Sequence, residues 1–254
     1  NSNSAQYGFL GGGQNCSIAS GSDHSVIVGG YNCDITSTGH DNVIGGGTNN
    51  NITGTCAAAT IPGGRDNDLS GSWSTIGGGI GCTNDANYAT VCGGHTSTVV
   101  SGANYGFLGG GYGNDINAAT EKNVLVGGNI NEIASTAAGS NVIVGGGANI
   151  IDGGGASGIL AGQACTISDS FSIICGGLTQ SVDSQYSFIG GGQNCSIVSG
   201  ASHSVIGGGN ANQITTATTG GSTVSGGTSN TIAANFCTIG GGTLINIAAS
   251  ATYG

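Results

Sequence analysis

The chain has 254 residues, with 55 glycines, one proline and only 6% charged residues, and no apolar run approaches the ~18 residues of a membrane span. The net charge is −10, with Arg65 and Lys122 as the only strong cations, which argues against nucleic-acid binding through clustered Lys and Arg. The glycines lack the Gly-X-Y triplet of collagen, and regular columns of Ile and Val argue against a disordered linker.

One short phrase recurs along the chain: an aliphatic residue, a glycine pair, two spacers, a small polar residue and a second aliphatic residue, as in residues 25–35 and 204–214. Successive copies lie 15 to 18 residues apart. The first aliphatic column reads Leu10, Ile27, Ile44, Ile61, Ile76, Val91, Leu108, Leu125, Ile143, Ile159, Ile174, Ile189, Ile206, Val224 and Ile239. The second reads Ile18, Ile35, Ile52, Leu69, Asn84, Val99, Ile116, Ile133, Ile151, Ile167, Val182, Ile197, Ile214, Ile232 and Ile247, with Asn84 as its one exception.

Each aliphatic segment is predicted to be a short strand, because it is too short for a helix and rich in β-branched residues. The glycines between the segments allow the backbone to bend. Units that cannot bury their apolar faces alone must stack. The sequence therefore predicts an all-β fold, a parallel β-roll or β-solenoid with two strands per ~16-residue turn and about 15 turns, built as one continuous array over residues 1–254.

The two strands of a turn differ in their polarity. The second alternates, so that in residues 15–18 Cys16 and Ile18 are expected to point inward while Asn15 and Ser17 point outward. The first is often apolar throughout, as in residues 26–28, and continuous apolarity indicates that both faces are covered. Because one thin roll covers a single face, we expect a side-by-side homo-oligomer, most economically a trimer.

A column of small polar residues lies two positions before the second aliphatic column. Pointing inward at one-turn intervals, its amides are expected to hydrogen-bond along the stack as a structural ladder. Its Cys and Asn members are Cys16, Cys33, Asn50, Asn67, Cys82, Asn114, Asn131, Asn149, Cys165, Cys195, Asn212 and Asn230.

The phrase Ser-Val-Ile-Val-Gly-Gly-x-x-Cys-x-Ile, as it stands in residues 25–35, resembles the head repeat of trimeric autotransporter adhesins. Its Ile-Gly-Gly-Gly-x-x-Asn form is similar to repeats of phage and giant-virus fibre proteins. The resemblance covers essentially the whole chain and implies a left-handed roll, three chains side by side, used for surface attachment. The bulkier Ile and the extra Gly depart from the Ala of the adhesin pattern, and no neck, stalk or anchor is recognisable. Because residues 251–254 match residues 103–106, which lead into another copy, we also expect a fragment of a longer array.

Neither a cofactor, a metal site nor a catalytic group is predicted. None of the nine cysteines forms a C-x2-C motif, which leaves buried thiols, disulfides or, least favoured, metal or redox chemistry as interpretations of them. His24 and His203 occupy equivalent repeat positions, which favours a copied structural residue over a unique catalyst. No serine is placed with a histidine and a carboxylate as a nucleophile.

Three sequons offer glycosylation sites, at Asn15, Asn51 and Asn194. The expected function is that of a non-enzymatic structural or adhesive fibre segment on an extracellular or virion surface, with its own copies and a host-surface glycan or protein as partners. The alternatives are a subunit of a self-polymerising extracellular filament and an ice-binding β-solenoid. The last would need a regular outward Thr column, whereas the outward positions vary among Ser17, Asp34, Asn51, Asp68 and Thr83.

Overall fold

A computed structural model describes residues 1–118, 120–135, 139–216 and 220–249. These residues form an all-β parallel β-solenoid of about 14 turns, with two strands per turn and no helix among them. The prediction of an all-β parallel β-solenoid with two strands per turn is therefore confirmed. The number of turns is about 14 rather than 15, because the fifteen aligned copies are separated by only fourteen one-turn intervals. Residues 251–254, on which the expectation of a longer array depends, lie outside the described residues.

The chain divides into two compact units, Asn1–Asn129 and Ile130–Gly254, and each is described by itself. The first contains β1 (Ser2–Asn3), β2 (Phe9–Leu10), β3 (Ser17–Ile18), β4 (Val26–Ile27), β5 (Asp34–Ile35), β6 (Val43–Ile44), β7 (Asn51–Ile52), β8 (Thr60–Ile61), β9 (Asp68–Leu69), β10 (Thr75–Ile76), β11 (Thr83–Asn84), β12 (Thr90–Val91), β13 (Thr98–Val99), β14 (Phe107–Leu108), β15 (Asp115–Ile116) and β16 (Val124–Leu125). The second contains β17 (Glu132–Ile133), β18 (Val142–Ile143), β19 (Ile150–Ile151), β20 (Gly158–Ile159), β21 (Thr166–Ile167), β22 (Ile173–Ile174), β23 (Ser181–Val182), β24 (Phe188–Ile189), β25 (Ser196–Ile197), β26 (Val205–Ile206), β27 (Gln213–Ile214), β28 (Thr223–Val224), β29 (Thr231–Ile232), β30 (Thr238–Ile239) and β31 (Asn246–Ile247).

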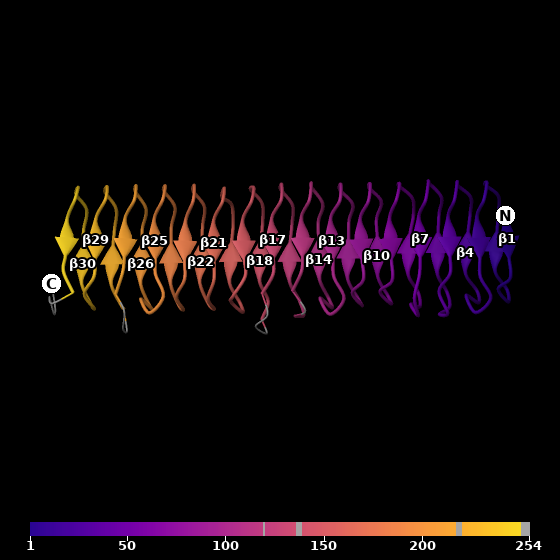
Figure 1. The fold of residues 1–254 in the computed structure, drawn as a ribbon, viewed down its shortest axis with the longest axis horizontal. Coiled ribbons are helices and arrows are strands. Elements are labelled where there is room, and N and C mark those ends of the chain that lie inside the picture. The colour runs from indigo at the N-terminus through magenta and orange to yellow at the C-terminus, as the bar shows by residue number, and fades with distance from the viewer. Residues whose placement is uncertain (119, 136–138, 217–219, 250–254) are drawn as a thin grey trace. The chain divides into compact units, whose positions relative to one another are not determined.

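Within each unit, the odd-numbered strands form one parallel sheet and the even-numbered strands form another (Figure 1). The register places equivalent residues of successive turns opposite each other, as Ile27 with Ile44 in the even sheet and Ile18 with Ile35 in the odd sheet. The second residue of nearly every strand is buried between the two sheets, as Ile27 and Ile35 are, each with none of its surface exposed. This thin core contains one aliphatic side chain from each sheet in nearly every turn, with the buried Asn84 as an exception, which explains the two aliphatic columns of the sequence.

Most of the described turns consist of two halves with the same local conformation. Each half has a residue with positive φ, then a small buried residue, an outward residue and a buried aliphatic residue, which Asn84 replaces in β11. One half is residues 32–35, with a φ of 52° at Asn32, and the next is residues 41–44, with a φ of 62° at Asp41. Asn and Asp tolerate this left-handed conformation better than most residues, which explains their frequency at these bends.

Glycine is required where neighbouring turns come close at the bend after each even strand. Gly47 has a φ of 92°, and a Cβ built on it would overlap the carbonyl oxygen of Gly64 in the next turn. The recurring glycines therefore allow both the bend and the close stacking of its backbone.

Candidate functional site

The predicted polar ladder is buried, and its amides bind mainly the backbone. The Nδ2 group of Asn50 donates to Gly46 O at 2.8 Å in its own turn and to Gly64 O at 3.0 Å in the next turn. The Oδ1 atom of Asn50 accepts from the backbone N–H of Asn67 at 3.2 Å and from its Nδ2 at 3.1 Å. One amide therefore pairs Gly46 O and the N–H of Asn67, which have no backbone partner among the described residues, and adds a second donor to Gly64 O, which also accepts from Thr48 N at 3.0 Å.

The cysteines of this column replace asparagine in the same role. The thiol of Cys33 donates to Gly46 O at 3.7 Å and to Gly47 O at 3.6 Å, both in the glycine bend of the next turn. In turn, Cys82 N donates to Oδ1 of Asn67 at 3.0 Å. Since a thiol is both a weak donor and a weak acceptor, it can replace the amide, which explains why this column contains both Asn and Cys. The nine cysteines are free thiols in the structure.

Removing one ladder amide should destabilise the fold by about 1–3 kcal/mol, because buried backbone groups lose their partners. In Asn149→Ala, Cys165 N–H loses its acceptor at 3.1 Å and Gly145 O loses its donor at 3.0 Å, while Gly162 O loses the amide at 2.9 Å and keeps the N–H of Gly147. Asn149→Cys should lose less, because the ladder thiols donate to the glycine carbonyls of the next turn, as Cys165 does to Gly177 O at 3.7 Å. Urea unfolding followed by circular dichroism under reducing conditions measures both. The exposed Asn210→Ala variant is the control, and an equal loss there would contradict a specific role for the ladder.

Burial of the ladder thiols also changes their pKa. Loss of hydration raises the pKa of Cys33, Cys82, Cys165 and Cys195 above the ordinary value of 9.0. Because the folded state favours the neutral thiol, its contribution to stability is complete below pH 9 and is lost as the pH rises towards the raised pKa.

We therefore expect the free energy of unfolding to fall above about pH 9. The double variant Cys165→Asn, Cys195→Asn should show a shallower fall, since asparagine occupies this column in other turns and does not titrate. Urea titrations at a series of pH values from neutral to alkaline check this. Identical pH slopes for the two proteins would show that other groups cause the loss.

A second buried ladder, which the sequence analysis missed, precedes the even strands. In it, Ser172 Oγ donates to Ser184 O at 2.9 Å and accepts from Ser187 N at 3.1 Å, so one hydroxyl again links backbone groups of neighbouring turns. The signal was present in the sequence as small polar residues two positions before the first aliphatic column. The Ser and Asn members are Ser25, Asn42, Ser74, Asn123, Asn141, Ser157, Ser172, Ser187, Ser204 and Ser222.

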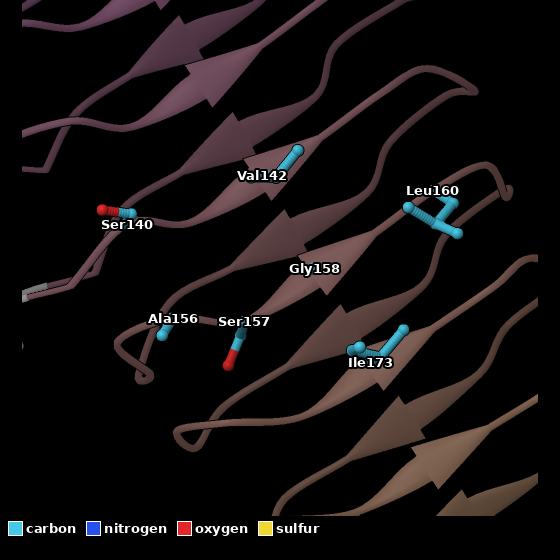
Figure 2. Close-up of a pocket in the computed structure, with 7 residues that line it drawn as sticks. All are labelled: Ser140, Val142, Ala156, Ser157, Gly158, Leu160 and Ile173. Atoms are coloured by element: carbon cyan, nitrogen blue, oxygen red, sulfur yellow. The ribbon is translucent and has the colours of Figure 1, made fainter.

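The outward residue of each even strand and the residue that follows the strand form a surface that we call the even-strand face. It includes Val26 and Val28 in the first unit, and Val28 is 56% exposed although it belongs to a continuously apolar segment. In the second unit, Gly158 lies between Val142 and Ile173 and leaves a hollow of about 320 Å³ (Figure 2). Ser140, Val142, Ala156, Ser157, Gly158, Leu160 and Ile173 line it.

The odd strands present a different outward surface. Their outward residues are polar in all but one turn, and several are acidic, as Asp34, Asp68 and Asp115 are. Ile150 is the apolar exception. The two sheets therefore expose unlike surfaces, one apolar with threonine and the other polar with carboxylates.

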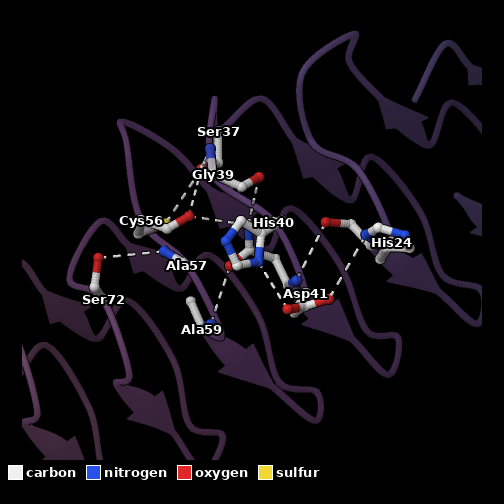
Figure 3. A network of polar contacts seen from close by, with 11 residues as sticks. His24, Ser37, Gly39, His40, Asp41, Cys56, Ala57, Ala59 and Ser72 are labelled. Atoms are coloured by element: carbon white, nitrogen blue, oxygen red, sulfur yellow. Dashed lines mark hydrogen bonds and ion pairs between the residues drawn. The ribbon is translucent and has the colours of Figure 1, made fainter. Parts of the chain in front are cut away.

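In many turns, the bend before the even strand carries an exposed aromatic residue. Trp73 stacks on Tyr88 with ring centroids 5.2 Å apart, and Tyr88 stacks on Tyr105 at 5.0 Å. His24 and His203 lie at equivalent positions of this bend, with φ values of 56° and 61°. His24 stacks on Tyr7, and its Nδ1 lies 4.0 Å from Asp41, whose other carboxylate oxygen lies 2.7 Å from Nδ1 of His40 (Figure 3).

The sequon asparagines lie in two environments. Asn15 and Asn194 are exposed at bends, with positive φ, where an attached glycan would meet solvent. Asn51 is half-buried on β7, and its Nδ2 donates to Asp68 Oδ1 at 3.0 Å. A glycan on Asn51 would therefore displace a cross-turn hydrogen bond, whereas one on Asn15 or Asn194 would not.

Among the described residues, no three His, Cys, Asp or Glu side chains are grouped so that they could hold a metal ion. The same residues include no helix that is long and apolar enough to cross a membrane. No protein-family model matches this chain, and no curated protein matches its sequence.

Proposed function

We propose that the chain is a non-enzymatic segment of a surface fibre in which three copies associate side by side through the even-strand face. The observation that carries the proposal is the chemistry of this face: at the described positions, none of its residues is charged, although the chain has a net charge of −10. When two copies pack through this face, no carboxylates on the contacting faces repel each other.

The exposed apolar area of this face also favours association. Val28 and Ile173 leave 56% and 44% of their surfaces exposed, and Phe9, Phe107, Val126, Val144 and Leu160 are exposed with them. Contiguous exposed apolar residues mark interaction surfaces in soluble proteins. A second copy packed on this face would bury these side chains. It would thereby cover the outward side of the continuously apolar even strands.

The remaining parts of the proposal follow the sequence resemblance. It supports a left-handed coil, a place on an extracellular or virion surface, and attachment to a host-surface glycan or protein. A stack of equivalent turns suits this function, because it presents one surface chemistry repeatedly and allows multivalent attachment.

The test is the native mass of the folded protein, measured by light scattering, together with electron microscopy. Discrete particles of three times the 24.2 kDa chain mass would support the fibre segment. Open-ended particles would instead indicate a filament subunit. A monomer with an intact fold would overturn the proposal.

A further inference from the structure

The bend before the even strands forms a column of outward side chains, one per turn. Backbone hydrogen bonds define it: Ala58 N donates to His40 O at 2.9 Å, Trp73 N to Ala57 O at 2.8 Å, and Tyr88 N to Ser72 O at 2.9 Å. Ala58 and Trp73 share a φ of 52°. In chain order the column of the first unit reads Tyr7, His24, Asp41, Ala58, Trp73, Tyr88, Tyr105 and Lys122.

The rings of this column stack face to face, and Ala58 interrupts the stack. The ring planes of Trp73 and Tyr88 are inclined by 3° and those of Tyr88 and Tyr105 by 7°, so both faces of Tyr88 are covered. On the other side of Trp73 the column has only the methyl group of Ala58. Trp73 is 57% exposed, and its indole face towards this turn has no ring partner among the described residues.

Polar groups lie on the far side of the Ala58 turn. His40 and Asp41 belong to the preceding turn and are joined by a 2.7 Å contact. With Asp23 and His24 they line an open hollow of about 490 Å³, on the part of the bend drawn in Figure 3. The indole face of Trp73 and the carboxylate of Asp41 therefore lie on opposite sides of the Ala58 turn. At the Ala58 position, where several other turns have an aromatic ring, a gap is left between them.

We propose that this gap binds a pyranose ring of a neutral or amino sugar. Its apolar C–H face would lie on the indole of Trp73, and its hydroxyl groups would donate to the carboxylate of Asp41. Asp23 and Asp41 disfavour acidic sugars, because like charges would be brought together. The inference rests on the proposed function, in which it names the class of glycan that the fibre recognises.

The second unit contains a related arrangement with one difference. Ala156 precedes a stack of Phe171, Tyr186 and His203, with centroids 5.0 Å apart in each pair. Ser140 stands where the first unit has Asp41, so the carboxylate acceptor is absent at that position. The second gap should therefore bind the same sugars more weakly.

Trp73 is the only tryptophan of the chain, so its fluorescence reports directly on the gap. Titration with the methyl glycosides of galactose, mannose and N-acetylglucosamine is expected to give a saturable change for at least one of them. N-acetylneuraminic acid should bind at least about tenfold more weakly. No saturable change with any neutral or amino sugar, or equal binding of the acidic sugar, would overturn the inference.

The matched variants are Ala58→Phe and Ala156→Phe, since aromatic residues already occupy this left-handed position in other turns. Ala58→Phe fills the gap and should weaken the Trp73 response at least about tenfold, whereas Ala156→Phe should leave it unchanged. An unaltered response in Ala58→Phe would overturn the site. Light scattering on the same samples separates the two proposals: a trimer without a sugar response contradicts only the sugar site, and a monomer with the response contradicts only the trimer.

Discussion

Ile174→Ala is expected to lower the free energy of unfolding by about 2–5 kcal/mol. Ile174 is the second residue of β22 and is fully buried, and it stacks in register on Ile159 and Ile189. The core contains one aliphatic side chain per strand, so the neighbouring turns cannot collapse into the cavity without losing their own hydrogen bonds. Urea unfolding followed by circular dichroism measures the loss.

The control for this prediction lies in an odd strand of the same unit. Ile150 and Ile151 form β19, and Ile150 points outward and is half-buried while Ile151 is fully buried. Ile150→Ala should therefore cost less than about 1 kcal/mol, while Ile151→Ala should match Ile174→Ala. Equal losses at Ile150 and Ile151 would show that the inward and outward assignment of this strand is wrong.

Ile173→Glu is expected to convert the proposed trimer into monomers of 24.2 kDa at concentrations at which the unaltered protein is trimeric. Ile173 is 44% exposed on the even-strand face, so a glutamate there remains hydrated in a single chain. In the assembly the same carboxylate would be buried in each of three copies without a partner, which is strongly unfavourable. Light scattering at a series of protein concentrations gives the mass.

Thr166→Glu provides the matched control, because it adds the same charge to the outward side of an odd strand, where carboxylates already occur. It should remain trimeric. Circular dichroism of both variants establishes that the fold is intact. If Ile173→Glu stays trimeric, the copies do not meet through the even-strand face, and if both variants dissociate, charge alone controls assembly.

The solenoid architecture could be predicted because its signal is repeated in every turn. A single pair such as Ile27 and Ile35 would not distinguish a strand from another apolar segment, but fifteen aligned copies do. The buried asparagine and cysteine column could be recognised for the same reason. Its hydrogen bonds could not, because the partners of Asn50 are backbone carbonyls of glycines, whose positions depend on the bend.

The second ladder and the aromatic column escaped the sequence analysis because of the bend before the even strands. This bend varies in length, from seven residues between Ile133 and Asn141 to four between Leu69 and Ser74, so alignment on the glycines shifts its residues out of register. Cross-turn hydrogen bonds restore the register in the folded chain. They bring Trp73 over Tyr88 although the sequence around the two residues has little in common.

The inward side chains could be predicted from the order of residues, because alternation along a strand and repetition along the chain are local properties. Which side chains of different turns meet could not be predicted, because that depends on the register of stacked strands and on the path of each bend. The ladder contacts, the unlike surfaces of the two sheets and the gap beside Trp73 all arise from that stacking.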